Sequence, residues 1–157
     1  MRIKIFWCLC LLLLVGTSNL SAAERLKPFV LGNQVQGEMV AVVDQVKERL
    51  QEAGLSVVGE YVPYDGAHII VVTNDYLKRL VGRQPNAAYL AGLRVSVTKT
   101  PAGVQVAYMN PRYFSHAYRV DENLQAVASL LENTLGAKES FGAKGLSAKK
   151  LRKYQYG

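Results

Sequence analysis

Residues 94–109 constrain the fold more than any other stretch of this sequence. RVSVTK, 94–99, and VQVAYM, 104–109, each alternate apolar and polar side chains, and the loop TPAG, 100–103, joins them. Alternation with a period of two indicates a half-buried strand, and a short glycine-containing loop between two such strands indicates an antiparallel hairpin. The chain must therefore build an antiparallel sheet and cover one face of it.

The flanking segments predict further strands and the helices that can cover this face. Apolar residues recur every three or four positions over 38–53, which predicts an amphipathic helix, and Gly54 is placed to end it. LSVVGEYV, 55–62, predicts a strand, PYDG, 63–66, a turn, and HIIVVT, 68–73, a central strand. Further predicted elements are a helix from Asn74 to Gly82, a short helical turn at 86–91, a last helix at 122–135 and an opening strand near 29–35. This order favours an α+β two-layer sandwich: a mainly antiparallel or mixed sheet with helices on one face.

The dipeptide Asn110-Pro111 marks the end of the hairpin's second strand. Asparagine is a favoured N-cap of helices, and proline is favoured at the first helical position. The sequence thus predicts a structural joint at which the strand passes directly into a helix.

The N-terminus reads as a secretory signal peptide over residues 1–23. Arg2 and Lys4 precede an apolar run of 11 residues, Ile5 to Val15, and small residues lead up to a cut after Ala23. A membrane-spanning anchor, the alternative, needs roughly 20 apolar residues. We therefore expect an exported, periplasmic protein whose mature chain begins at Glu24.

Both cysteines, Cys8 and Cys10, lie within this leader, so the mature chain contains none. An exported domain without disulfides depends on its hydrophobic core, for which this length is sufficient. Thiol chemistry, iron–sulfur clusters and cysteine-bound zinc are excluded for the mature chain.

The positive charge is concentrated at the C-terminus. Residues 24–136, the predicted single domain, carry 11 basic and 11 acidic side chains, whereas residues 137–157 carry six basic and one acidic, a net charge of +5. The sequence predicts a basic tail over 137–157, either solvated or bound to an anionic membrane surface or an acidic protein. Because the body is neutral and exported, no nucleic-acid partner is expected.

Three stretches resemble the family catalogued as domain of unknown function 302. They are VKERLQEAGLSVVGE, 46–60, LRVSVTKTPAGVQVAYMNPRYF, 93–114, and FGAKGLSAKKLRKYQYG, 141–157, which is similar to the ending of exported members. The resemblance implies a small two-layer α/β domain without an established activity. Many members carry Cys-Asn-Pro after the central strand. The matching residues here are Thr73, Asn74 and Asp75, so the resemblance implies no cysteine chemistry.

Motifs for catalysis or metal binding are missing. The two histidines, His68 and His116, form no HExxH and no helical pair, and Ser115 beside His116 cannot pair with it because helical neighbours diverge by about 100°. There is no Gly-rich phosphate loop and no GxSxG. We expect no catalytic residue, no metal ligand and no cofactor, although a small enzyme with a polar pocket stays open as an alternative.

Tyrosines and capping asparagines supply the candidate site. Asn74 and Asn110 are each predicted to begin a helix at one edge of the sheet, and Tyr76, Tyr108 and Tyr113 lie beside them. Helix N-termini attract polar and anionic groups, and tyrosine suits binding surfaces. We therefore expect non-covalent binding of a small ligand or partner protein by these five residues. An envelope protein acting through its basic tail, and pairing of two copies, are further alternatives.

Overall fold

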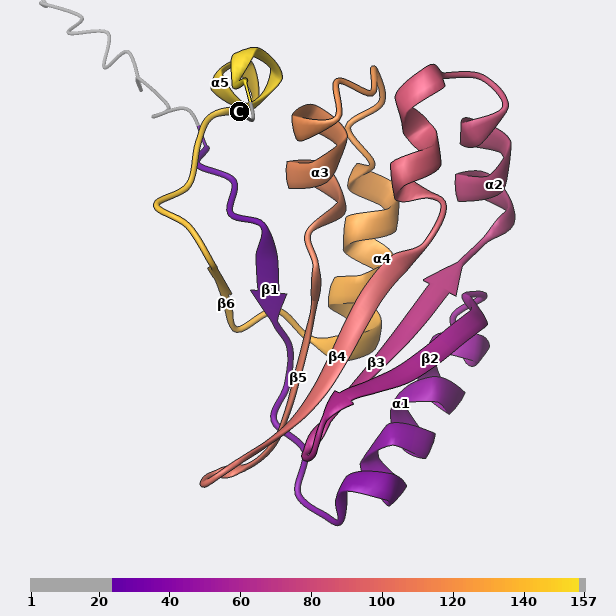
Figure 1. Cartoon of the computed structure of the whole chain (residues 1–157), viewed down its shortest axis with the longest axis vertical. Helices are drawn as coiled ribbons and strands as arrows, with labels where there is room; N and C mark the ends of the chain where they lie inside the picture. Colours follow the sequence, from indigo (N-terminus) through magenta and orange to yellow (C-terminus); the bar gives the residue numbers. More distant parts are fainter. Residues whose placement is uncertain (1–23, 156–157) are drawn as a thin grey trace, which may run out of the picture.

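A computed structural model describes residues 24–155, which form a six-stranded sheet with helices against it (Figure 1). The predicted signal peptide, residues 1–23, lies outside the described residues, as do residues 156–157. Within residues 24–155, no helix has the length and apolar character needed to cross a membrane.

The elements follow the predicted order with two additions at the C-terminal end. The strands are β1 (Phe29–Leu31), β2 (Ser56–Tyr64), β3 (Ala67–Thr73), β4 (Leu93–Thr100), β5 (Gly103–Met109) and β6 (Glu139–Phe141). The helices are α1 (Met39–Glu52), α2 (Asp75–Val81), the 3₁₀ helix η1 (Pro85–Leu90), α3 (Pro111–Ala117), α4 (Gln125–Leu135) and α5 (Ala148–Lys153).

All five strand pairs of the sheet are antiparallel, in the order β2-β3-β4-β5-β1-β6. The predicted hairpin is its centre: β4 and β5 pair from Val95–Tyr108 to Thr100–Gly103, and β3 lies on the far side of β4. Strand β2 occupies one edge, where Pro63, which cannot donate a ladder hydrogen bond, is tolerated. The predicted α+β sandwich with a mainly antiparallel sheet is confirmed.

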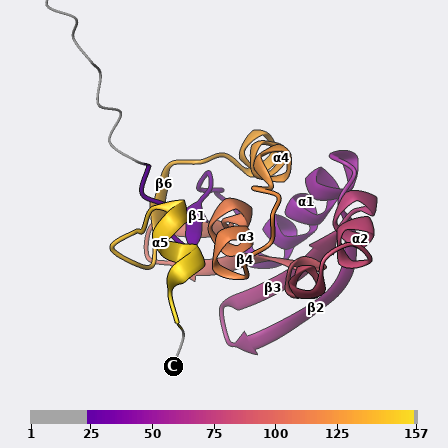
Figure 2. The same ribbon diagram turned by 90° about the horizontal axis from the view of Figure 1, so that it is seen from above.

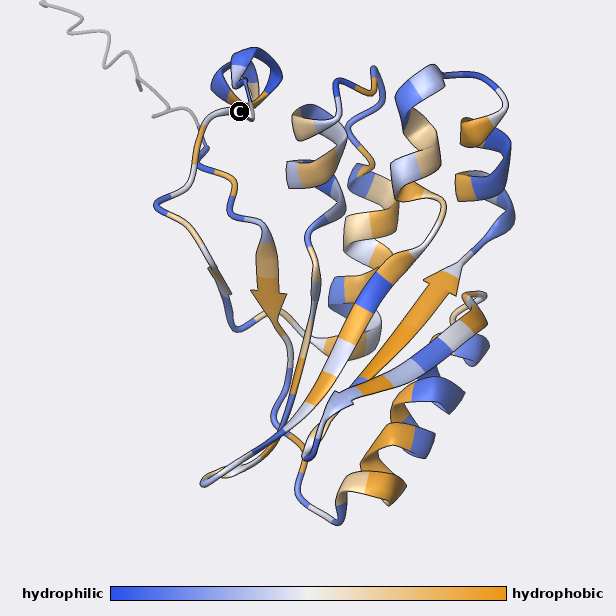
Figure 3. Ribbon diagram, in the orientation of Figure 1, coloured by the Kyte–Doolittle hydropathy of each residue, from blue (hydrophilic) through white to orange (hydrophobic). Residues whose placement is uncertain are grey.

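One face of the sheet is covered by α1 and α4 (Figure 2). Helix α1 buries Val42, Val43, Val46 and Leu50, and α4 buries Val127, Leu131 and Leu135. These side chains share one core with the inward residues of the central strands, among them Ile70, Val95, Val97 and Val106. The hydropathy colouring in Figure 3 shows the same division, with an apolar β3 and an α1 that is hydrophilic on its outer side. Gly54 ends α1 with a φ of +81°, which glycine adopts without strain.

The C-terminal segment differs from the expected tail. Residues 139–141 form β6 and pair with β1, Leu146 pairs with Leu26, and α5 packs against α3. Leu151 of α5 is 0 % exposed. The physical reason is that β1 would otherwise leave its outer edge unpaired, and that Leu151 completes the packing on α3. Residues 139–155 thus belong to the domain, and α4 is not its last helix.

We predict that Leu151→Ala lowers the free energy of unfolding by about 2–5 kcal/mol, the range for removing a buried leucine side chain. Urea denaturation monitored by circular dichroism measures the change. Lys153→Ala, on the exposed side of the same helix, is the control and should stay within about 0.5 kcal/mol of wild type. A Leu151→Ala variant as stable as this control would mean that α5 does not contribute to the core.

Candidate functional site

The predicted site lies at the end of the sheet where the C-terminal ends of β3 and β5 meet the helices. Both strands are antiparallel to β4, so they run in the same direction and deliver α2 and α3 to the same edge. Asn74 Oδ1 accepts a hydrogen bond from the Leu77 amide at 2.9 Å, and Asn110 Oδ1 accepts from the Arg112 and Tyr113 amides at 3.1 and 3.4 Å. Both predicted caps are confirmed.

Asn110 also ties the helix to the N-terminal strand. Its Nδ2 donates to the Lys27 carbonyl at 2.9 Å, and its backbone N–H donates to the Pro28 carbonyl at 2.8 Å. The residue is buried, and its side-chain oxygen and nitrogen both have protein partners. Asn110 is therefore a structural joint whose polar atoms are already occupied.

The three tyrosines point to different places. The Tyr76 hydroxyl donates to Glu122 Oε2, and burial, followed by this contact with a carboxylate, raises the pKa of Tyr76 to about 12. The Tyr113 ring packs edge-on against Phe114, with ring centres 5.1 Å apart. Tyr108 is a core residue: it is 2 % exposed and its hydroxyl donates to the Gly136 carbonyl at 2.9 Å, and burial raises its pKa.

The five predicted residues thus do not converge on one pocket. The side chain of Tyr108 faces the helical layer, because residues alternate along β5 and Tyr108 lies in register with the buried Val95 and Val30. Ligand binding by Asn74, Tyr76, Tyr108, Asn110 and Tyr113 stays a prediction, and of these five Tyr108 is among the residues that line a hollow on the other face of the sheet. Thr73, the last residue of β3, is buried, and its hydroxyl has no hydrogen-bond partner in the described part of the chain.

A hollow of about 310 Å³ lies instead on the sheet face opposite α1 and α4. The strand register explains it. Tyr61, Ile69, Ser96, Ala107 and Leu31 are successive partners across five strands and share this face. The middle positions of this row, Ser96 and Ala107, carry short side chains, so the surface of the sheet is depressed between the larger side chains on either side.

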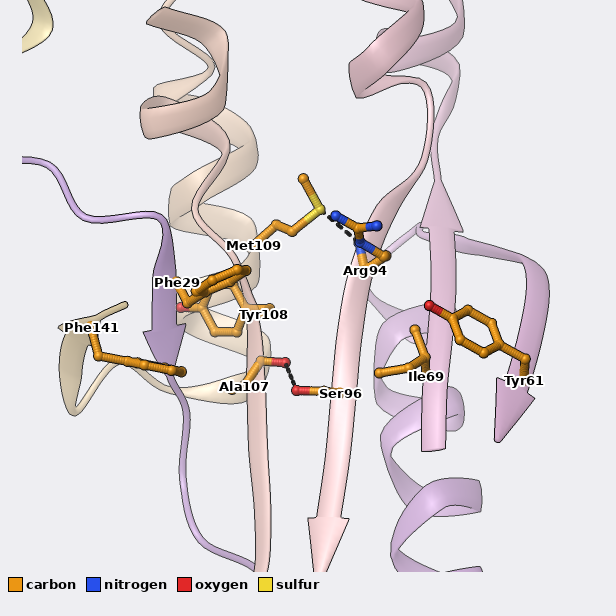
Figure 4. Close-up of a pocket in the computed structure, with 9 residues that line it drawn as sticks. All are labelled: Phe29, Tyr61, Ile69, Arg94, Ser96, Ala107, Tyr108, Met109 and Phe141. Atoms are coloured by element: carbon orange, nitrogen blue, oxygen red, sulfur yellow. Dashed lines mark hydrogen bonds between the residues drawn. The ribbon is translucent and has the colours of Figure 1, made fainter. Parts of the chain in front are cut away.

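Larger side chains stand around this depression (Figure 4). Phe29 of β1 and Phe141 of β6 are register partners with ring centres 5.7 Å apart, and they form one wall. Tyr61 stands at the opposite side, on β2, and is 48 % exposed. The aromatic walls and the aliphatic floor can hold a flat apolar group between them.

Arg94 supplies the positive charge at this hollow. Its side chain is exposed and forms no ion pair with any of residues 24–155, while its backbone N–H donates to Met109 Sδ at 3.4 Å. Ser96 Oγ donates to the Ala107 carbonyl at 3.2 Å. The lining residues include no carboxylate and no imidazole. This arrangement can bind an anionic group beside an apolar one, but it places no general base beside a nucleophile.

The histidines lie elsewhere. His68 Nε2 of β3 lies 2.9 Å from Glu60 Oε2 of the edge strand β2, and the buried Nδ1 of His116 in α3 has no hydrogen-bond partner among residues 24–155. Burial, reinforced by the charges of Arg152 and Arg112, lowers the pKa of His116 below its usual 6.5. Among the described residues, no three His, Cys, Asp or Glu side chains gather to hold a metal ion.

Sequence reasoning missed the hollow and its residues Phe29, Tyr61, Arg94, Ser96 and Phe141. Alternation correctly separated the two faces of β4 and β5, but it assigned no role to the polar face. The available signal was the row of short side chains opposite aromatic ones, and reading it requires the register between strands that are distant in sequence.

We predict that Asn110→Ala lowers the free energy of unfolding by about 1 kcal/mol, within a range of roughly 0.5–2, through loss of the α3 cap. Asn110→Asp is the matched variant: it keeps a capping oxygen, replaces the donor to Lys27 with a second oxygen, and adds a negative charge that the helix N-terminus favours. Chemical denaturation of both variants separates the cap from the bond to Lys27. An Asn110→Ala protein as stable as wild type would contradict the role of a structural joint.

His116 predicts a pH dependence of stability. Its folded-state pKa is lowered, so the unfolded chain binds more protons, and stability decreases as the pH falls through about 6.5 and below. His116→Gln cannot titrate and should lose less stability between about pH 7.5 and pH 5. Thermal unfolding of both proteins across this range measures the difference. Parallel pH profiles would show that His116 does not contribute.

Comparison with known proteins gives a likeness of fold. No family model matches the sequence, and no curated protein does. A search of solved structures finds an uncharacterized conserved DUF302 protein from Bacillus stearothermophilus, with a TM-score of 0.57 and 13 % sequence identity. The match covers 68 % of this chain and 93 % of that one. The fold that the sequence motifs implied is confirmed: the chain adopts a DUF302-like α+β fold.

Proposed function

We propose that this protein is an exported binding domain that takes a small ligand with a flat apolar body and one anionic group on the open face of its sheet. The observation that carries the proposal is the position of Arg94. An arginine without an ion pair among the described residues stands at the rim of an apolar hollow with aromatic walls.

The dimensions of the hollow suit a small ligand. Ligand pockets usually begin at about 300 Å³, and this one measures about 310 Å³. Strand pairing fixes the backbone at Phe29, Phe141 and Tyr61, and the two phenylalanine rings also pack on each other. Since these side chains lie on strands and not on a loop, binding costs little further ordering.

The anionic group follows from the chemistry of arginine. Its planar guanidinium forms bidentate hydrogen bonds with carboxylates, sulfonates and phosphates, and these bonds are stronger than those between neutral groups. The lining offers no carboxylate that would repel such a group. For the alternative of a small enzyme, the described hollow offers no nucleophile paired with a base.

The test uses the fluorescent probe 8-anilinonaphthalene-1-sulfonate, an aromatic body with one sulfonate, at temperatures where each variant is folded. Arg94→Gln should weaken binding about tenfold, the loss of one charged hydrogen-bonding contact. The control is Arg49→Gln. Arg49 is exposed on α1, on the other side of the sheet from the hollow, so this variant loses the same charge and should bind the probe like wild type. Aromatic carboxylates should displace the probe.

Filling the hollow gives a second, independent variant. Ser96→Tyr places a ring in the depression between the larger side chains and should abolish probe binding. Thr98→Tyr, two residues along the same strand and on the same face but outside the lining, is the control. If probe binding survives both Arg94→Gln and Ser96→Tyr, the hollow is not the site. A monomer–dimer shift caused by Ser96→Tyr would instead identify a second copy as the occupant.

A further inference from the structure

A second surface, distinct from the hollow, collects most of the molecule's excess charge. Six basic side chains come from residues 25–27 and 144–153, and we refer to them as the basic face: Arg25, Lys27, Lys144, Lys149, Lys150 and Lys153. Sequence alone places the last four in a tail, whereas in the structure they stand on a folded segment that α5 holds in place through Leu151.

Backbone pairing brings the two parts of the basic face together. Leu26 and Leu146 exchange backbone hydrogen bonds of 2.9 and 3.0 Å. Arg25 Nη2 donates to the Gly145 carbonyl at 2.9 Å, and the side chains of Arg25 and Lys27 both lie against Gly145. Lys144 precedes this glycine, so three cations surround one turn of the chain.

The other three cations surround a shallow hollow on α5. Lys149, Lys150 and Lys153 line it together with Leu146 and Tyr154, and its volume is about 510 Å³. Leu146 and the tyrosine ring give the hollow an apolar part between the ammonium groups. Tyrosine combines an apolar ring with a polar tip, a combination favoured at the boundary between lipid and water.

Four acidic groups lie near the basic face. Glu132 and Glu139 line a hollow together with Arg25 and Lys27 but form no ion pair with them in the described part of the chain, and the other two are engaged by other arginines. Glu24 is held by Arg112, with Oε1 2.7 Å from Nη1, and Asp121 is held by Arg152 at 2.9 Å. Within residues 24–155, none of the six cations of the basic face forms an ion pair. Their charges therefore act together on whatever approaches this end of the molecule.

From this placement we propose that the basic face docks the protein onto the surface of an anionic membrane. Charge complementarity is the first reason, because clustered lysines and arginines are attracted to anionic lipid headgroups. The second reason is the apolar part of the hollow on α5, where Leu146 and Tyr154 lie among the lysines, because an apolar ring with a polar tip is favoured where lipid meets water.

The experiment measures co-sedimentation of the chain beginning at Glu24 with vesicles of phosphatidylcholine alone and of phosphatidylcholine with phosphatidylglycerol. We expect binding only to the anionic vesicles, and loss of binding when salt is raised from about 0.05 M to about 0.5 M. Replacing Lys149, Lys150 and Lys153 together with glutamine should weaken binding on the order of 100-fold, about fivefold for each lysine.

A matched triple variant separates the basic face from net charge. Glutamine at Lys47, Lys78 and Lys99 removes the same total charge from α1, α2 and the β4–β5 hairpin, and it should leave binding within about threefold of wild type. Circular dichroism confirms that both triple variants are folded. Equal losses in the two triple variants, or equal binding to both kinds of vesicle, would overturn the proposal. Retention on an acidic protein with no vesicle binding would do so as well.

Discussion

The pairing of β1 on both of its edges is the interaction on which the rest of the structure depends. This strand has three residues, yet it pairs with β5 on one side and with β6 on the other. Because β1 lies between β5 and β6, it joins the beginning of the described chain to its end. The bonds from Asn110 to the Lys27 and Pro28 carbonyls connect α3 to the two residues just before this strand. Without β1, Phe29 would have no fixed position beside Phe141, and residues 25–27 would not reach Gly145.

The one-sided cover of the sheet is the second constraint. Helices α1 and α4 bury the valine-rich face of β4 and β5, and the same alternation leaves Arg94 and Ser96 on the other face. An open sheet face carrying several aromatic side chains is costly to leave in water, and this cost is offset when a ligand or partner covers it. The two proposed surfaces therefore differ in their physical basis: one is apolar with a single cation, and the other is a cluster of cations around a small apolar patch.

The end of the sheet where β3 and β5 finish shows that capping rules can be correct while the capping side chains are already engaged by the protein. Asn74 and Asn110 cap their helices as their residue type predicts. Capping uses the same side-chain oxygens that a ligand would need, and Tyr76 is engaged by Glu122. The side chains of Asn74, Asn110 and Tyr76 have protein partners, because a polar atom removed from water without a partner is expensive. The buried Thr73 hydroxyl is an exception within the described residues.

The sequence by itself determined the α+β class, the central hairpin and its buried face, the helix at 39–52 with its glycine end, and the strand-to-helix joint at Asn110-Pro111. These features depend on side-chain periodicity and capping chemistry within a few residues of each other. Only the tertiary structure decided that residues 139–155 belong to the fold, that Tyr108 is a core residue, and that Phe29, Arg94 and Phe141 meet around one hollow. Those outcomes depend on register between strands that lie as much as 112 residues apart, as Phe29 and Phe141 do. Local periodicity assigns a residue to a face of its own strand, but which distant residues share that face is decided only when the strands pair.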